Sequence, residues 1–212
     1  LPEVYFTSST GKFAEADLPF YPIWFNFKDG GFFGYAIGSY WQHLTSNFYP
    51  LNVTIAPGDY HYFNQQLLLQ TDPSKIINAN VTLTTGTYFN GKLTSGDYKI
   101  QFAPSPHVSF LGEYNQNYFT KVGINNTTKT VNLLILQTRL ALNPRLQFTG
   151  LYQKNTLNNS DAYNLRVAWE FSPLSYVYFI YNRGVNSQLS ASQAVTQVED
   201  HIIFKVSYFQ QF

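Results

Sequence analysis

The stretch "YNLRVAWEF", Tyr163–Phe171, decides the fold, because the character of its side chains alternates from one residue to the next. One set of positions is apolar and holds Tyr163, Leu165, Val167, Trp169 and Phe171; the positions between them hold Asn164, Arg166, Ala168 and Glu170. A β-strand directs successive side chains to opposite faces. The stretch therefore predicts a strand with one apolar wall and one polar wall.

The same alternation recurs along the chain, for example in "YKIQF" (98–102), "VSFLGEYN" (108–115) and "RLQFTGLYQ" (145–153). Helical periodicity is nearly absent, and β-branched and aromatic residues dominate. The pattern predicts about twelve strands, at 20–28, 31–45, 50–56, 60–70, 77–89, 92–102, 107–118, 130–142, 145–153, 163–172, 174–183 and 201–212. A further strand is predicted near "EVYFTS" (3–8), and "KDGG" (28–31) predicts a hairpin turn. The alternation is weakest over residues 1–49.

The composition favours a membrane-spanning sheet over a soluble domain. Charged residues are 12 % of the 212 residues, about half the usual share, while aromatic residues are 18 %. No run of about 18 apolar residues predicts a spanning helix. A transmembrane barrel reconciles these facts, because half of each strand faces lipid and half faces a polar lumen. The alternative is a soluble β-sandwich or lipocalin-like barrel.

The connections between the predicted strands alternate in kind. Proline-containing turns ("TDPSK", "APSPH", "LNPR", "FSPLS") alternate with polar segments such as "TKVGINNTTK" and "KNTLNNSDA". Short periplasmic turns and longer outer loops are typical of outer-membrane barrels. We therefore expect an all-β, antiparallel transmembrane β-barrel in the bacterial outer membrane. Residues 1–212 form one barrel domain, or the C-terminal part of a larger barrel.

Several segments carry a resemblance to a known family: "GTYFNGK", "APSPHVSFLGEYNQN" and "YNLRVAWEFSPLSYVYFIYNRG" with the terminal "FKVSYFQQF". They resemble the C-terminal barrel of a family of large outer-membrane proteins of the Bacteroidota. Members commonly carry an N-terminal module similar to carbohydrate-binding family 9. The matching positions include Arg166, Trp169, Pro173, Tyr181 and Asn182. The resemblance covers roughly residues 50–212. It implies an anchor or conduit for surface glycan handling, although that module is absent from this chain.

The polar walls supply the candidate functional residues. The predicted lumen-lining residues are Lys99, Glu113, Gln137, Arg139, Arg166, Glu170 and Lys205. Their charges suit a lumen that selects solutes, or alternatively a packed interior of paired charges. A rim hydrolase would need a site such as Glu199–His201, for which a solvated loop end is the plainer interpretation. No cofactor, metal site or nucleic-acid partner is expected, given a net charge of +1, no cysteine and no close histidine spacing.

Tyrosines near the predicted strand ends admit two interpretations. They are Tyr152, Tyr163, Tyr176, Tyr178, Tyr181 and Tyr208. Aromatic girdles at the membrane interfaces are one possibility, and sugar-binding platforms are the other. The girdle is the favoured prediction.

The last predicted strand, 201–212, carries apolar side chains on one wall and ends on an aromatic residue. Ile202, Phe204, Val206, Tyr208 and Phe212 are predicted to face lipid, with Lys205 and Ser207 toward the lumen. This ending resembles the signal that the barrel-assembly machinery recognises, so Phe212 is expected to be the true terminus and Leu1 a point of truncation. The expected partners are the lipid bilayer, lipopolysaccharide, the assembly machinery and other outer-membrane subunits or a missing N-terminal part. The functional alternatives are an anchor or conduit, a general solute channel, a rim enzyme and a soluble lipid-binding β-protein.

Overall fold

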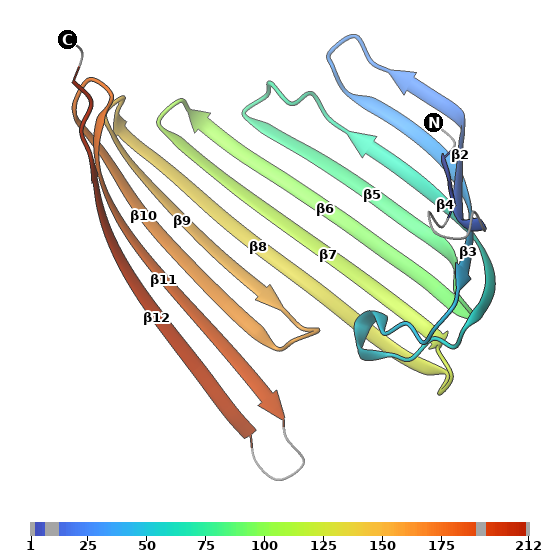
Figure 1. Cartoon of the computed structure of the whole chain (residues 1–212). Coiled ribbons are helices and arrows are strands. Elements are labelled where there is room, and N and C mark those ends of the chain that lie inside the picture. Colours follow the sequence, from blue (N-terminus) through green and yellow to red (C-terminus); the bar gives the residue numbers. More distant parts are fainter. Residues whose placement is uncertain (1–2, 7–12, 190–193, 211–212) are drawn as a thin grey trace. The chain divides into compact units, whose positions relative to one another are not determined.

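The computed structural model describes residues 3–6, 13–189 and 194–210, and these form one antiparallel sheet whose strands follow one another in chain order (Figure 1). The strands are β1 (Glu3–Phe6), β2 (Phe13–Asn26), β3 (Phe32–Leu44), β4 (Gly58–Gln70), β5 (Ile77–Tyr88), β6 (Gly91–Ser105), β7 (Val108–Val122), β8 (Thr127–Asn143), β9 (Leu146–Asn155), β10 (Ser160–Ser172), β11 (Ser175–Leu189) and β12 (Ala194–Ser207). The only helix among the described residues is a 3-10 turn, η1 (Pro50–Asn52). The predicted all-β, antiparallel class is confirmed.

The predicted strand at 50–56 is wrong, whereas the further strand predicted near residues 3–8 is confirmed. Residues 50–56 do not form a strand, because Pro50 opens a 3-10 turn and both Leu51 and Asn52 have left-handed backbone angles, with φ of 57° and 60°. Such angles lie far from the extended region that a strand requires. The "EVYF" segment does form β1, which brings the number of strands to twelve.

The turns are shorter than the polar segments suggested. β7 continues to Val122 and β8 begins at Thr127, so most of "TKVGINNTTK" lies in strands. The same holds for "KNTLNNSDA", where Asn155 of β9 pairs with Ser160 of β10. The backbone groups of threonine and asparagine can make ladder hydrogen bonds like those of any other non-proline residue, so their polar composition did not mark the strand ends. The "KDGG" hairpin is confirmed, with the Phe27 N–H donating to the Gly31 carbonyl at 2.8 Å and Gly30 at φ 90°.

The chain divides into two compact units. Unit 1 comprises Leu1–Pro73, Ala79–Tyr98 and Asn115–Val131, and unit 2 comprises Ser74–Asn78, Lys99–Tyr114 and Asn132–Phe212. Unit 1 buries a small apolar cluster: Ala36, Val53, Ile55, Phe89, Phe119, Val122 and Val131. Among the described residues of unit 2, Ser175 alone is buried. Unit 2 is thus a sheet with two accessible faces.

The registers of unit 2 assign each strand residue to one of these faces. On β10, Leu165 pairs with Gly150 of β9 and Tyr181 of β11, whereas Arg166 pairs with Thr149 and Ile180. We call the side that carries Leu165 the apolar face and the side that carries Arg166 the polar face. The apolar face bears large exposed side chains on β8, β10, β11 and β12: Leu136, Leu140, Leu165, Trp169, Phe179, Ile202, Phe204 and Val206. The alternation predicted for residues 163–171 is therefore confirmed.

Candidate functional site

The polar face of unit 2 gathers the cations that the sequence singled out. Arg139 and Arg166 flank Thr149 in one cross-strand row, since Thr149 pairs with both of them. The adjacent row runs through Ala141, Gln147, Ala168, Tyr178 and Lys205. Residues from five consecutive strands, β8 to β12, thus meet on one surface.

Both arginines lean toward that second row. The Arg139 Nη2 donates to the Gln147 Oε1 at 3.3 Å. The Arg166 Cζ lies 4.9 Å from the centroid of the Tyr178 ring, within the range of a cation–π interaction. Lys205 is directly opposite Tyr178 across the β11–β12 pair. The small side chain of Ala168 lies between Gln147 and Tyr178.

The other predicted lumen-lining residues lie on the same face but apart from this group. Lys99 of β6 and Glu113 of β7 form an ion pair of 2.7 Å with each other. Gln137 pairs with Leu151 one row beyond Arg139, on the side away from Gln147. The Glu170 Oε1 accepts the Leu174 N–H at 2.9 Å, so this carboxylate is engaged at the β10–β11 turn.

Tyr178 and Tyr176 were expected in a membrane girdle, and the structure corrects this. Ala168 pairs with Tyr178 and Glu170 with Tyr176, so both rings share the polar face with Arg166. Their rings stack at 5.6 Å. Strand parity decides the face, and proximity to a strand end does not. Gln147, Ala168 and Tyr178 were not recognised from the sequence as parts of a site, although the register could have revealed them.

The remaining girdle tyrosines border the apolar face of unit 2. The Tyr152 hydroxyl donates to Asp161 at 2.7 Å, and Lys154 lies 3.6 Å from the same carboxylate. Between β11 and β12, the Tyr181 hydroxyl donates to Asp200 at 2.7 Å. Two further residues complete this border: Tyr163, whose ring lies 4.9 Å from that of Tyr152, and Arg183, whose Nε lies 3.9 Å from Asp200. Tyrosines backed by charged groups mark the edge of an apolar band.

Unit 1 carries a different feature, a loop that packs against Phe89 and Gly123. We call Thr45–Pro57 the capping loop. A bridge between Phe48 and Ile55 closes it on itself, with N···O distances of 3.0 and 2.8 Å. Ile55 is 1 % exposed, and Phe48 packs on Phe89 of the β5–β6 hairpin at 5.8 Å.

The capping loop is held by the turn between β7 and β8. The Ile124 N–H donates to the Thr54 carbonyl at 3.0 Å, and the Lys129 Nζ donates to the Leu51 carbonyl at 3.3 Å. Asn90 bonds both the N–H and the carbonyl of Gly123, at 2.8 and 3.0 Å. The neighbouring buried ring, Phe119, lies on the same face of β7 as Asn117 and Asn115. The capping loop therefore packs against the end of β7 that leads into the β7–β8 turn.

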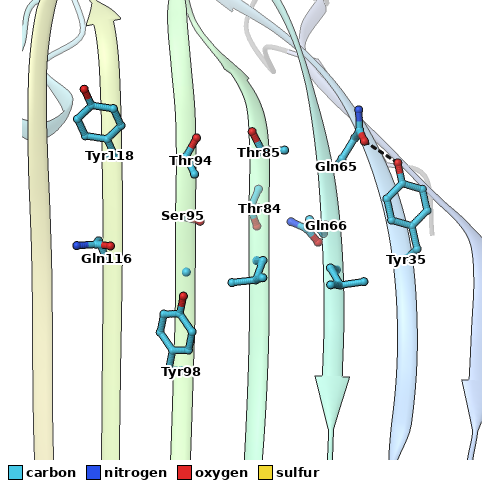
Figure 2. Close-up of a pocket in the computed structure, with 13 residues that line it drawn as sticks. Tyr35, Gln65, Gln66, Thr84, Thr85, Thr94, Ser95, Tyr98, Gln116 and Tyr118 are labelled. Carbon is cyan, nitrogen blue, oxygen red and sulfur yellow. Dashed lines mark hydrogen bonds between the residues drawn. The ribbon is translucent and has the colours of Figure 1, made fainter.

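The opposite face of unit 1 has a hollow of about 340 Å³, shown in Figure 2. Tyr35 and Gln65, whose side chains share a 2.7 Å hydrogen bond, lie at one side of it, and Tyr118 lies at the other. Gly96 leaves the space open, and the ring of Tyr98 leans over it. The lining also includes Leu67 and Leu83 and contains no ionised group.

The predicted terminal strand is present as β12, and its alternation holds as far as the structure describes it. Ile202, Phe204 and Val206 pair with Tyr181, Phe179 and Val177 on the apolar face, while Lys205 and Ser207 lie on the polar face. Tyr208 follows the end of the strand and is exposed. Phe212 lies outside the described residues. Within them, β12 pairs with β11 alone and β1 with β2 alone, so both are edges of the sheet.

The residues of the rim-enzyme candidate, Glu199–His201, do not come together on one face. Glu199 and His201 approach to 4.0 Å on the polar face, but Asp200 points to the opposite face, where it meets Tyr181 and Arg183. In the described part of the chain, no group of three or more histidine and carboxylate side chains could hold a metal ion. Likewise, no described helix has the length and apolar character to cross a membrane.

No protein-family model matches the chain. Comparison with curated proteins and with solved structures gives no match either. The resemblance to the Bacteroidota family stays a prediction.

Proposed function

We propose that this chain forms the wall of an outer-membrane β-barrel and lines an aqueous passage with its polar face. The observation that carries the proposal is the division of unit 2 into an apolar face and a polar face. Contiguous exposed apolar patches on soluble monomers rarely exceed a few hundred Å². Trp169 and Phe204 are 50 % and 68 % exposed, and β8, β10, β11 and β12 all contribute exposed apolar side chains to this face.

The dimensions of the apolar face support a membrane location. The alternating apolar positions of β10 run from Tyr163 to Phe171, which is about 27 Å along a strand at roughly 3.3 Å per residue. At a tilt of about 40° this gives about 20 Å of height, comparable with the ~25 Å apolar band of outer-membrane barrels. The band is bordered by Tyr152 and Tyr181 with their carboxylate partners.

Membrane insertion also requires the edges of the sheet to be paired. Each unpaired backbone N–H or C=O costs several kcal/mol in lipid. β12 spans fourteen residues, whereas β1 spans four. β1 is therefore too short to pair along the whole length of β12, so the rest of the β12 edge must be paired or shielded from lipid when the sheet is in the membrane. The glycan-handling role rests on the family resemblance alone.

A general solute channel is the second candidate, and the cations on the polar face favour it. Arg139, Arg166 and Lys205 face away from the apolar side. A water-filled lumen would hydrate such side chains, whereas a dry interior would have to pair them.

Tryptophan quenching by brominated lipids tests the membrane proposal. With Trp24→Phe and Trp41→Phe, Trp169 on the apolar face becomes the single tryptophan and can be excited selectively. After refolding into vesicles, we expect bromine on the acyl chains to quench it strongly. The matched control replaces Trp169 by Phe and carries Tyr178→Trp on the polar face, where we expect little quenching. Equal quenching of the two proteins, or none of either, would contradict the proposal.

A further inference from the structure

We propose that the polar face of unit 2 contains an oxyanion-binding site, over Ala168, for a small solute that bears a carboxylate or phosphate group. The proposal deepens the aqueous passage described above and rests on it, because the site must be open to water. Its components are Arg139, Arg166, Gln147, Tyr178 and Lys205, which the registers of β8 to β12 bring to two adjacent rows.

The register puts a small side chain between longer polar ones. Ala168 lies at the centre of its row, with Gln147 on one side and Tyr178 on the other. Its side chain is a single methyl group, so it forms a low floor between two longer neighbours. Arg139 reaches the Gln147 side of this floor and Arg166 reaches the Tyr178 side. The two guanidinium groups therefore border the same floor.

These cations differ from the other strand-borne cations of unit 2 in lacking a carboxylate partner. Lys99 pairs with Glu113, Lys154 with Asp161 and Arg183 with Asp200. Within the described residues, Arg139, Arg166 and Lys205 have no carboxylate within ion-pair distance. The nearest carboxylate along β10 is Glu170, which accepts the Leu174 N–H at the turn. The site thus has a net positive charge that a solute can neutralise.

The chemistry of the side chains selects an oxyanion. A guanidinium group presents parallel N–H donors that match a carboxylate or phosphate in a bidentate manner. The Gln147 amide and the Tyr178 hydroxyl add neutral hydrogen-bonding groups for the remainder of the solute. Lys205 adds a third positive charge beyond Tyr178 and attracts anions over a longer range. A neutral sugar would leave all three cations without compensation.

Calorimetric titration of the refolded full chain in detergent micelles tests the site without requiring a sealed membrane. The probes are inorganic phosphate, sodium glucuronate and, as the neutral counterpart, glucose. We expect phosphate and glucuronate to bind and glucose not to bind. Arg139→Gln and Arg166→Gln should each weaken binding about tenfold or more, which is the usual effect of losing one charged hydrogen bond. Raising the NaCl concentration should weaken it further.

Two variants separate a specific site from a general charge effect. Ala168→Glu leaves every cation in place but puts a carboxylate on the floor, and we expect it to abolish binding. Lys99→Gln removes one positive charge from the same face at a position already paired with Glu113, and it should leave affinity unchanged. Each variant is compared with the parent chain at equal β-sheet content in circular dichroism.

The outcomes are distinguishable from those of the membrane test. Binding of only phosphate or only glucuronate supports the site and narrows its class. No binding by the parent chain, equal binding of glucose, or equal losses in Lys99→Gln and Arg166→Gln would overturn it. If Trp169 is quenched by lipid while no anion binds, only this inference fails. If anions bind while Trp169 is not quenched, the membrane proposal fails.

Discussion

Gly123 closes the turn between β7 and β8 and is buried against the capping loop. Its φ is 76°, in the left-handed region that side chains disfavour. A Cβ atom there would collide with the Val53 Cγ1 and with the Thr54 carbonyl oxygen. No side chain at this position could avoid both the backbone penalty and the clash, so glycine is required by the contact between turn and loop.

We expect Gly123→Ala to lower the free energy of unfolding by about 1–3 kcal/mol, from the left-handed backbone and the clash with Val53. Denaturant unfolding of the refolded chain measures this. The matched control is Gly184→Ala, since a Cβ at Gly184 would meet no atom within 4 Å and its φ is not left-handed. That control should change the stability by less than about 1 kcal/mol. Equal losses in the two variants would argue against the packing described for Gly123.

The capping loop is the element that gives unit 1 its buried cluster. Val53 and Ile55 come from the loop, while Phe89, Val122 and Val131 come from strands and turns around it. Four hydrogen bonds tie the loop and the β7–β8 turn to their surroundings. The loop therefore behaves as a packed part of unit 1.

Ile55→Ala should loosen the capping loop by about 2–4 kcal/mol, because it removes a side chain that is 1 % exposed from this cluster. Hydrogen exchange at the amides of Val53 and Ile55 measures the free energy of local opening. Ile124→Ala makes the same chemical change in the adjoining turn, where the side chain is 60 % exposed. We expect the exchange rates in Ile124→Ala to stay close to those of the parent chain. Similar acceleration in both variants would contradict the assignment of Ile55 to a core.

At the scale of the molecule, the contrast between its two faces matters more than any single contact. Unit 2 buries almost none of its described residues, so its stability depends on the medium around the sheet. Lipid against the apolar face and water against the polar face would satisfy both surfaces. We therefore expect an added charge to lower the folding free energy little on the polar face and much more on the apolar face.

Leu165→Lys should reduce the folding free energy in lipid vesicles by about 2–4 kcal/mol, the cost of a lysine at the middle of the apolar band. Leu151→Lys makes the same substitution on the neighbouring strand, but Leu151 pairs with Asn164 on the polar face. We expect it to cost less than about 1 kcal/mol. Denaturant titration in vesicles measures both values. A cost for Leu151→Lys that equals that for Leu165→Lys would contradict the assignment of the faces.

Much of the sheet could be predicted from alternation alone, especially from Ile77 onward. The predicted strand at 163–172 corresponds to β10, and the strand at 145–153 corresponds to β9. The first third was harder to predict for two physical reasons. The register of β2 shifts between Phe20 and Ile23, beside two prolines, which interrupts the period of two. In β3 the polar-face positions Gly34, Ala36 and Gly38 are small rather than polar, because Trp24, Leu68 and Tyr40 pack closely on the two glycines.

The sequence by itself determined the all-β class, the two walls of each regular strand and the shared face of Lys99, Glu113, Gln137, Arg139, Arg166, Glu170 and Lys205. These properties are local, since alternation along one strand assigns each residue to a wall. Only the tertiary structure decided which of these residues meet. Register placed Ala168 between Gln147 and Tyr178, and it left Arg139, Arg166 and Lys205 without carboxylates while pairing Lys99 with Glu113. Register depends on turn geometry and on pairing between strands, which no single strand encodes.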